Sequence, residues 1–378
     1  MQLRETYLEI DLSRVEFNLN VFRKKIRPET KILANLKGNA YGTDAILLGK
    51  FLEQKNIDYF SVAYINEGVR LRKAGIQAKL LVFNPSTENI QALIDFDLEP
   101  EVSSLRYLNI LIDFLRQKNI KNFPIHIKLD TGMHRAGIME DELDELIELL
   151  KNSKEIKIQS LFTHLAASED PDEDDFTIKQ LELFEKFSKK IKDKTGQDFF
   201  KHALNSAGVF RFPQYQMDMI RPGLGIFGYN LVKNPDMELK PIARLLTKIN
   251  QIKYLSTGES VGYNRKFIAR KPAKIALLPL GYADGISRKL GNGNWKVHIN
   301  GKQAPIVGNV SMDTISIDVT GIDCKPGDEV IIFDNEKDVY RMSEKLETIP
   351  YEIITSITQR VPRIAKKLRL IFSSKNLL

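Results

Sequence analysis

Short apolar runs alternate with amphipathic stretches along the first 220 or so residues of the chain. The apolar runs have the length of buried strands, and apolar residues recur at helical spacing in most of the stretches between them. The predicted strands are 31–36, 58–63, 79–83, 97–102, 123–129, 156–164, 200–204 and 217–221. The predicted helices are 66–74, 87–95, 104–118, 142–152 and 174–193. This regular alternation favours an α/β fold with a parallel (β/α)8 barrel, and an open doubly wound sheet is the alternative.

Beyond about Leu239 the helical periodicity fades, and short alternating runs are separated by Gly, Asn and Asp turns. This pattern is typical of a mainly antiparallel β domain. We therefore expect a barrel over residues 11–238 and a β domain over residues 239–378. Two helices are expected near the C-terminus, at about 341–346 and 350–358, and a short strand is expected at Thr6–Asp11.

Composition limits the classes of protein that the chain can belong to. The 378 residues are enough for two or three domains, and the net charge of +7 is mild and spread along the chain, which indicates a solvated surface rather than a nucleic-acid-binding one. No apolar stretch approaches the ~20 residues of a membrane span, and no signal peptide is recognisable. The single cysteine, Cys324, excludes an intrachain disulfide, and the five histidines show no zinc-binding spacing. We therefore expect a cytoplasmic protein without a metal, and without a nucleic-acid or membrane partner.

Polar and ionisable residues follow several of the predicted barrel strands. They are Lys37, Lys128, Asp130, His164, Asn205, Ser206 and Arg221. The carboxyl ends of barrel strands share one rim, where active sites form, so these side chains are expected to meet there.

Lys37 stands between an apolar strand and the turn at Gly38. Burial there would lower the pKa of its amine, and only a neutral amine attacks an aldehyde to form a Schiff base. The alternative is a strand-end lysine that extends its amine into solvent.

A glycine-rich string at Gly223–Gly228 matches GxGxxG, but it is a weak dinucleotide signal. It lies late in the chain, no convincing βαβ unit follows, and no acid stands about twenty residues further on. Two readings remain open for this string, a backbone cradle for one phosphate group and a tight turn.

A set of short motifs resembles the alanine racemase family over nearly the whole chain. LKGNAYG at 36–42 resembles the family's pyridoxal-phosphate attachment signature. The other matches are KLDTGMHRAG (128–137), FTH (162–164), HALNSA (202–207), RPG (221–223), VGY (261–263), GYADG (281–285), GNVSMD (308–313), TIPYE (348–352) and RVPR (360–363). The resemblance implies a pyridoxal-phosphate-binding barrel followed by a β domain, on which residues 1–10 are expected to pack.

The resemblance also implies roles for individual residues. Lys37 is expected to hold pyridoxal 5'-phosphate, and Lys37 and Tyr263 are expected to be two acid/base groups on opposite faces of the substrate. Tyr263 would come from the partner subunit of a head-to-tail homodimer, and His164 would help it electrostatically to lose its proton. Arg221 is expected to face the pyridine nitrogen. The expected cofactor-binding residues are Lys37, Tyr41, His202, Asn205, Ser206, Arg221, Gly223, Leu224 and Tyr351.

For the substrate, the resemblance implies that Arg135 and the backbone amide of Met312 contact the carboxylate, and that Tyr282 lines the entrance. Lys128 matches a position that is carbamylated in some members, and an unmodified lysine is the alternative. Four departures from the family pattern bear on the pocket and hence on substrate breadth, namely Thr43-Asp44, Gly262, Phe267 and Ser311.

The expected activity is the interconversion of L- and D-alanine by an isomerase, which would supply D-alanine for peptidoglycan. One alternative is a broad-specificity amino-acid racemase. A second is a pyridoxal-phosphate amino-acid decarboxylase on the same type of barrel, and a third is a non-catalytic protein that binds pyridoxal phosphate.

Overall fold

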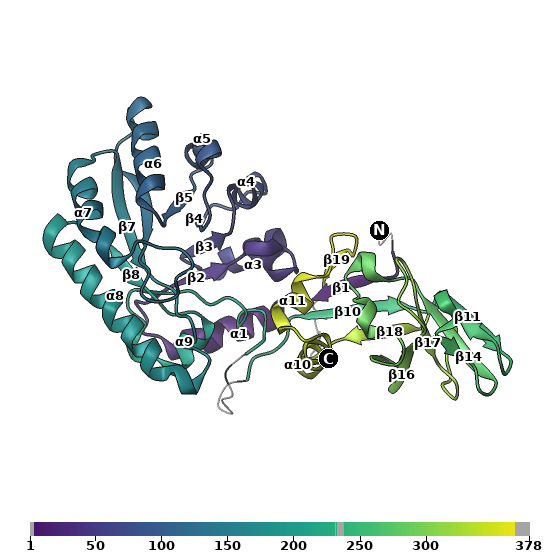
Figure 1. Ribbon diagram of the computed structural model, residues 1–378. Coiled ribbons are helices and arrows are strands. Elements are labelled where there is room, and N and C mark those ends of the chain that lie inside the picture. Colours follow the sequence, from purple (N-terminus) through teal and green to yellow (C-terminus); the bar gives the residue numbers. More distant parts are fainter. Residues whose placement is uncertain (1–3, 231, 233–237, 367–378) are drawn as a thin grey trace, which may run out of the picture. The chain divides into compact units, whose positions relative to one another are not determined.

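The computed structural model describes residues 4–230, 232 and 238–366 of the chain (Figure 1). It divides into two compact units. One unit covers residues 15–240, and the other combines residues 1–14 with residues 241–378. Residues 1–3 and 367–378, which the sequence assigned to the β-domain part, lie outside the described residues.

The first unit contains an eight-stranded sheet whose neighbouring strands are all parallel. Its strands are β2 (Lys31–Asn35), β3 (Tyr59–Val62), β4 (Lys79–Val82), β5 (Glu99–Val102), β6 (Phe123–Lys128), β7 (Ile156–Phe162), β8 (Phe200–His202) and β9 (Met219–Ile220). Their order is β8-β7-β6-β5-β4-β3-β2-β9, and hydrogen bonds from Asp218 N to Lys201 O (3.1 Å) and from Arg221 N to Leu204 O (2.9 Å) join its two ends. The barrel prediction is therefore confirmed, and the doubly wound sheet was wrong.

Helices lie before the first barrel strand and after most of the barrel strands. They are α1 (Leu12–Lys25), α2 (Lys37–Tyr41), α3 (Ala45–Glu53), α4 (Ile65–Lys73), α5 (Ile90–Asp95), α6 (Leu105–Gln117), α7 (Leu143–Asn152), α8 (Asp174–Thr195) and α9 (Ser206–Arg211). Short 3-10 turns lie at η1 (Thr87–Asn89), η2 (Glu140–Glu142), η3 (Pro171–Glu173) and η4 (Pro213–Tyr215). Helix α6 shows why the sequence pattern worked, because Leu108, Leu111 and Leu115 are fully buried at helical spacing and Ser104 caps its first turn.

The second unit is built on a nine-stranded, mainly antiparallel sheet, as predicted, with the order β11-β14-β17-β16-β15-β18-β10-β1-β19. The strands are β1 (Tyr7–Ile10), β10 (Ala243–Lys248), β11 (Gln251–Leu255), β14 (Ala273–Leu278), β15 (Lys296–Ile299), β16 (Lys302–Val307), β17 (Ile315–Asp318), β18 (Glu329–Phe333) and β19 (Arg363–Ala365). A separate ribbon pairs β12 (Ser260–Val261) with β13 (Phe267–Ile268). The N-terminal strand β1 pairs with β10 and β19, so the first and the last described strands of the chain lie in the same sheet.

Short helical segments complete the second unit. They are η5 (Tyr263–Arg265), η6 (Tyr282–Asp284), η7 (Arg288–Leu290), α10 (Glu336–Leu346) and α11 (Pro350–Thr355). The predicted start of the first C-terminal helix near residue 341 was wrong. Helix α10 begins at Glu336 because the Asn335 side chain accepts a hydrogen bond from Asp338 N (3.0 Å) and caps it.

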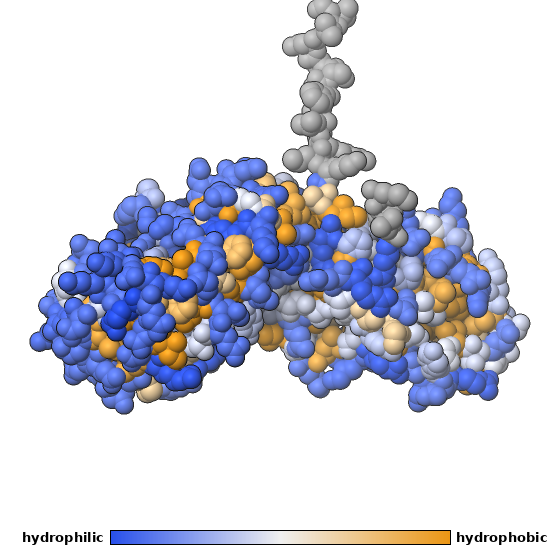
Figure 2. All heavy atoms as spheres, turned by 90° about the horizontal axis from the view of Figure 1, so that it is seen from above, coloured by the Kyte–Doolittle hydropathy of each residue, from blue (hydrophilic) through white to orange (hydrophobic). Residues whose placement is uncertain are grey.

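The hydropathy of the surface is consistent with the solvated surface that the mild net charge indicates. Figure 2 shows hydrophilic residues over most of the visible face, with apolar patches between them. Among the described residues, none of the helices is long and apolar enough to cross a membrane.

Candidate active site

A cavity of about 340 Å³ lies in the barrel unit and is lined by residues at and beyond the carboxyl ends of its strands. The lining residues are Asn35, Lys37, Ala63, Phe83, Asn84, Glu101, Lys128, Arg135, Ala136, Phe162, His164 and Arg221. Five of them were predicted site residues, namely Lys37, Lys128, Arg135, His164 and Arg221. The cavity therefore carries four cationic side chains and one histidine.

The Lys37 amine lies in this cationic surrounding at the start of α2. Burial lowers the pKa of the amine, and the charges of Arg135 and Lys128 lower it further, whereas Glu67 opposes them. The ring of Phe83 lies 6.0 Å from Nζ. A larger fraction of the amine is therefore neutral and nucleophilic than in a lysine exposed to solvent.

The turn after Lys37 is left-handed. Residues Gly38, Asn39, Ala40 and Tyr41 have φ angles of 60°, 53°, 53° and 54°, a conformation that costs roughly 1–2 kcal/mol for each residue with a side chain. Hydrogen bonds from Gly38 N to Glu67 Oε1 (2.8 Å) and from Ala40 N to Leu36 O (2.7 Å) hold it. The strained turn lies directly after Lys37, whose amine lines the cavity.

Arg221 is buried and is held by five acceptor contacts. Its Nη2 donates to Thr163 O (2.6 Å) and Ala203 O (3.1 Å) and lies 3.3 Å from His164 Nδ1. Its Nη1 donates to His202 O (2.9 Å) and His202 Nδ1 (2.8 Å). Burial lowers the pKa of Arg221 to about 9, so the guanidinium keeps its charge at neutral pH.

Both histidines that contact Arg221 are neutral at neutral pH. Burial lowers the pKa of His164 and of His202 well below the usual value, and the charge of Arg221 lowers both further. A neutral imidazole carries no positive charge. The expected electrostatic help from His164 to Tyr263 stays a prediction, and it would have to come from a neutral ring in contact with Arg221.

Replacing His202 with Gln should make the stability of the protein less sensitive to acid. His202 is fully buried, so below about pH 6.5 the unfolded chain takes up a proton that the folded chain excludes, and stability falls as the pH falls toward the folded-state pKa. This group alone contributes about 1.4 kcal/mol per pH unit in that window. Urea midpoints at pH 7.5 and 5.5 should differ less in the variant than in the wild type, and an equal difference in both would contradict this account.

Glu101 is a site residue that the sequence analysis missed. Its Oε1 lies 3.6 Å from Lys128 Nζ, whereas its Oε2 is buried and has no hydrogen-bond partner within the described chain. Burial raises the pKa of the carboxyl to about 7, although the charges of Lys128, Arg221 and Arg135 oppose this. Glu99 and Glu101 belong to the buried strand β5, and two acids within a buried strand were the available signal.

Four of the predicted phosphate-binding residues form one cluster in the barrel unit. Ser206 Oγ accepts hydrogen bonds from Gly223 N (2.9 Å) and Gly225 N (3.2 Å). A Cβ atom at position 223 would lie 2.4 Å from the hydroxyl oxygen of Tyr41, so only glycine fits there. Leu224 is buried beside this turn. Hydroxyl groups and main-chain amides thus form a small polar cradle of the kind that binds phosphate.

Asn205 and His202, predicted as cofactor-binding residues, already have protein partners. Asn205 Oδ1 accepts hydrogen bonds from Gly208 N (2.8 Å) and Ser168 Oγ (2.9 Å) and caps α9. His202 stacks on Phe162, with ring centroids 4.9 Å apart, and does not line the cavity. Their direct contact with a cofactor stays a prediction.

The remaining predicted residues lie in the β-domain unit. Tyr263 is 69 % exposed, and its carbonyl accepts a hydrogen bond from Asn309 Nδ2 (3.1 Å). Backbone hydrogen bonds from Tyr282 N to Ser311 O and from Ala283 N to Met312 O (both 3.0 Å) tie Tyr282 to the same loop. Tyr263, Tyr282 and Met312 are therefore organised around residues 308–313, whereas Tyr351 lies on α11.

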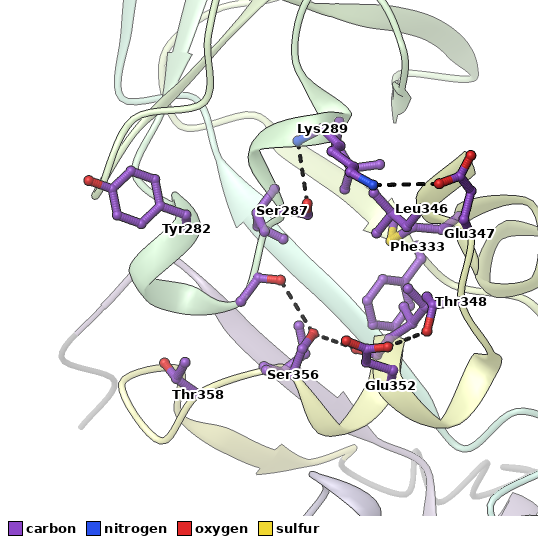
Figure 3. A pocket seen from close by; sticks show the side chains of 16 residues that line it. Tyr282, Ser287, Lys289, Phe333, Leu346, Glu347, Thr348, Glu352, Ser356 and Thr358 are labelled. Atoms are coloured by element: carbon purple, nitrogen blue, oxygen red, sulfur yellow. Dashed lines mark hydrogen bonds and ion pairs between the residues drawn. The ribbon is translucent and has the colours of Figure 1, made fainter. Parts of the chain in front are cut away.

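A second cavity, of about 600 Å³, lies in the β-domain unit beside η6, η7, α10 and α11 (Figure 3). Its lining includes Phe333, Met342 and Ile353, and Tyr282 stands at one side of it. Several of the polar groups that Figure 3 shows interact with one another, including Lys289 Nζ and Glu347 Oε2 (3.8 Å) and the side chains of Thr348 and Glu352. This lining carries no concentration of charge like that around Lys37.

The reactive amine, the cationic wall and the polar cradle fit a small phosphorylated aldehyde held through lysine. Together with the parallel barrel, they define the class of β/α-barrel enzymes that bind such a cofactor at the carboxyl rim of the strands.

The comparisons with known proteins identify the family within this class. The model of the alanine racemase N-terminal domain matches residues 10–231, and that of the alanine racemase C-terminal domain matches residues 242–365. The alanine racemase 1 of Caldanaerobacter subterraneus is 34% identical over 96% of this chain and 95% of its own. The alanine racemase 1 of Clostridium acetobutylicum is 36% identical over 96% and 95%. The chain belongs to the alanine racemase family of isomerases.

Solved structures agree with this assignment. The alanine racemase of Clostridium difficile 630 superposes with a TM-score of 0.91 at 32% identity, covering 97% of each chain. The alanine racemase of Bartonella henselae, with covalently bound pyridoxal phosphate, superposes with a TM-score of 0.84 at 29% identity over 96% of this chain and 99% of that one.

Proposed function

We propose that the chain interconverts L- and D-alanine with pyridoxal 5'-phosphate attached to Lys37. The observation that carries the proposal is the Lys37 amine, whose pKa is lowered within a cationic cavity at the carboxyl rim of the barrel. Pyridoxal phosphate, when bound, supplies an electron-accepting ring that makes the Cα proton of an attached amino acid acidic. Tyr41, Ser206, Gly223 and Leu224 would hold the phosphate, with Tyr351 as a further ligand.

Racemisation requires that the Cα proton leaves one face of the substrate and a proton returns to the other. Two proton-transfer groups must therefore flank the substrate. Lys37 Nζ serves one face. Tyr263 serves the other, from the partner subunit of a homodimer, and its high exposure in the single chain is consistent with a role at a subunit interface. Met312 and Tyr282 would enter the site with Tyr263, because one loop connects all three.

Arg135 would bind the substrate carboxylate, as its position on the cavity wall allows. Lys128 beside it has a carboxylate partner in Glu101. The carbamylated and the unmodified form of Lys128 stay the two alternatives, because the Glu101 carboxyl, with its pKa raised to about 7, carries only part of a negative charge at neutral pH.

The D-alanine formed would be used for peptidoglycan. The enzyme would act in the cytoplasm, and a single buried cysteine, Cys324, is consistent with a reducing compartment.

Replacing Arg221 with Glu should increase side transamination. Arg221, charged at neutral pH, would face the pyridine nitrogen of the bound cofactor and would disfavour a proton there, which would make the ring a weaker electron acceptor and favour return of the proton to the substrate carbon. We expect the fraction of turnovers that end in pyruvate to rise at least about tenfold, since a single group of this kind tunes a cofactor strongly. Arg221→Lys, which keeps the charge, is the matched control. An unchanged pyruvate fraction in a folded Arg221→Glu variant would refute the proposed role.

The rival activities are separated by their products. A decarboxylase releases carbon dioxide from the amino acid, whereas a racemase retains the carboxylate and exchanges only the Cα proton. The test is to incubate the holoenzyme with L-alanine in D2O. We expect deuterium at Cα without carbon dioxide, and carbon dioxide without D-alanine would favour the decarboxylase. Repeating the assay with other amino acids measures the substrate range of the enzyme. The departures from the family pattern at Thr43-Asp44, Gly262, Phe267 and Ser311 do not determine this range.

A further inference from the structure

A continuous chain of hydrogen bonds crosses the interior of the barrel from Arg221 to Glu99. Arg221 Nη1 lies 2.8 Å from His202 Nδ1, and His202 Nε2 lies 2.9 Å from Ser160 Oγ. Ser160 Oγ lies 2.6 Å from His126 Nδ1, and His126 Nε2 lies 2.7 Å from Glu99 Oε2. Neighbouring strands β5, β6, β7 and β8 contribute one member each, and Arg221 follows β9. All five members are buried.

The two ends of this chain fix the direction of every hydrogen bond in it. A guanidinium only donates, so His202 Nδ1 must accept and the proton of the neutral ring is on Nε2. His202 Nε2 then donates to Ser160, and the single hydroxyl proton of Ser160 has His126 Nδ1 as its acceptor. His126 therefore carries its proton on Nε2 and donates it to the Glu99 carboxylate, which only accepts.

No other arrangement satisfies all the buried groups. A proton on His126 Nδ1 would face Ser160, which would then receive two donors and leave its own proton without a partner, and a buried unsatisfied donor is costly. At the far end Glu99 is held in place by two further contacts. Tyr59 Oη lies 3.2 Å from Oε2, and Lys79 Nζ lies 3.4 Å from Oε1.

The same chain of hydrogen bonds also affects how Arg221 is held. Three of the acceptors of Arg221 are main-chain carbonyls, whose acceptor role cannot change. His202 Nδ1 can change, because a ring with its proton on Nδ1 would oppose the guanidinium. We propose that Glu99, His126 and Ser160 are positioning residues for Arg221, which act by keeping His202 Nδ1 unprotonated. This inference rests on the role of Arg221 in the proposed function.

The tautomers can be measured without turnover. In holoenzyme labelled with 15N-histidine, only five histidines give side-chain signals, and His126 and His202 can be assigned by substitution. At pH 7 both rings should be the neutral tautomer with the proton on Nε2. A proton on Nδ1 of either ring, or an imidazolium at His126, would overturn the inference.

Variants test whether the chain acts on the reaction. Ser160→Ala interrupts the chain at its centre, and Ser160→Thr restores a hydroxyl. Ser61→Ala is the matched control, because Ser61 is also fully buried on a barrel strand but its hydroxyl has no hydrogen-bond partner within the described chain. Glu99→Gln keeps an acceptor oxygen and removes the charge, so it tests the charge at the end of the chain.

We expect Ser160→Ala to raise the fraction of turnovers that end in pyruvate by roughly three- to tenfold, because a coupled buried network loses more than one bond when it is cut. Glu99→Gln should raise it by about threefold, the order expected for a hydrogen bond to a charged group that loses its charge. Ser160→Thr and Ser61→Ala should stay close to the wild type.

Equal pyruvate fractions in Ser160→Ala and Ser61→Ala, with the His202 signals unchanged, would show that the hydrogen-bond chain has only a packing role in the barrel. If the wild type formed no D-alanine at all, the proposed function would fail. The tautomers of His126 and His202 would still decide whether the chain is built as inferred, so the two failures are distinguishable.

Discussion

Lys37→Ala should lower kcat/KM for alanine by at least about four orders of magnitude, because one substitution removes both the covalent attachment and one proton-transfer group. Borohydride reduction of the wild-type holoenzyme should attach the cofactor to the peptide that contains Lys37, and the variant should give no such adduct. Lys31→Ala is the matched control, because Lys31 is an exposed lysine at the opposite end of the same strand β2. Substantial racemisation by Lys37→Ala, or an adduct on another lysine, would show that the amine has been misassigned.

Tyr263→Phe should block proton transfer on one face of the substrate and leave proton transfer on the other face intact. The loss of one of two proton-transfer groups should lower racemisation by about a hundred- to ten-thousandfold. Lys37 still serves its own face, so exchange of the Cα proton with D2O should survive for one enantiomer of alanine and disappear for the other. Tyr254→Phe is the control, because Tyr254 is a 78 % exposed tyrosine of the same unit that has no assigned role. An equal effect on exchange of both enantiomers would count against two separate groups.

The same two variants test the shared site. In a mixed dimer of Lys37→Ala and Tyr263→Phe subunits, one site combines both defects, and the other pairs an intact Lys37 with the intact Tyr263 of the partner subunit. Random mixing makes half of the dimers mixed, so denaturation and joint refolding of the two inactive variants should restore about a quarter of wild-type activity. If Tyr263 acted within its own subunit, no mixed dimer would contain an intact site and no activity would return.

The barrel could be predicted from the sequence because its signals are local. Buried parallel strands form apolar runs, and helices such as α6 place their apolar residues on one face. The meeting of Lys37, Lys128, His164 and Arg221 followed from a rule about strand ends, which requires only that the strands are identified correctly. The start of α10 was missed because Asn335, one side chain at its cap, decides it.

Other features depend on contacts that the sequence does not display. The Lys37–Gly42 motif predicted a turn, but the left-handed conformation of this turn is held by a hydrogen bond from Gly38 N to Glu67, which lies in another part of the barrel. Glu99 and Glu101 are two residues apart on β5, yet one pairs with His126 and the other with Lys128. The neutral state of His164 follows from its burial beside Arg221, which no spacing of residues reveals.

The central claim is that this chain racemises alanine, and the most direct measurement follows both enantiomers over time with the holoenzyme. L- and D-alanine have the same free energy in water, so a racemase must bring either pure enantiomer to an equal mixture. We predict that L-alanine and D-alanine, incubated separately, converge on equal amounts of the two forms with total alanine conserved. If neither enantiomer changes while borohydride trapping shows the cofactor on Lys37, the claim is contradicted.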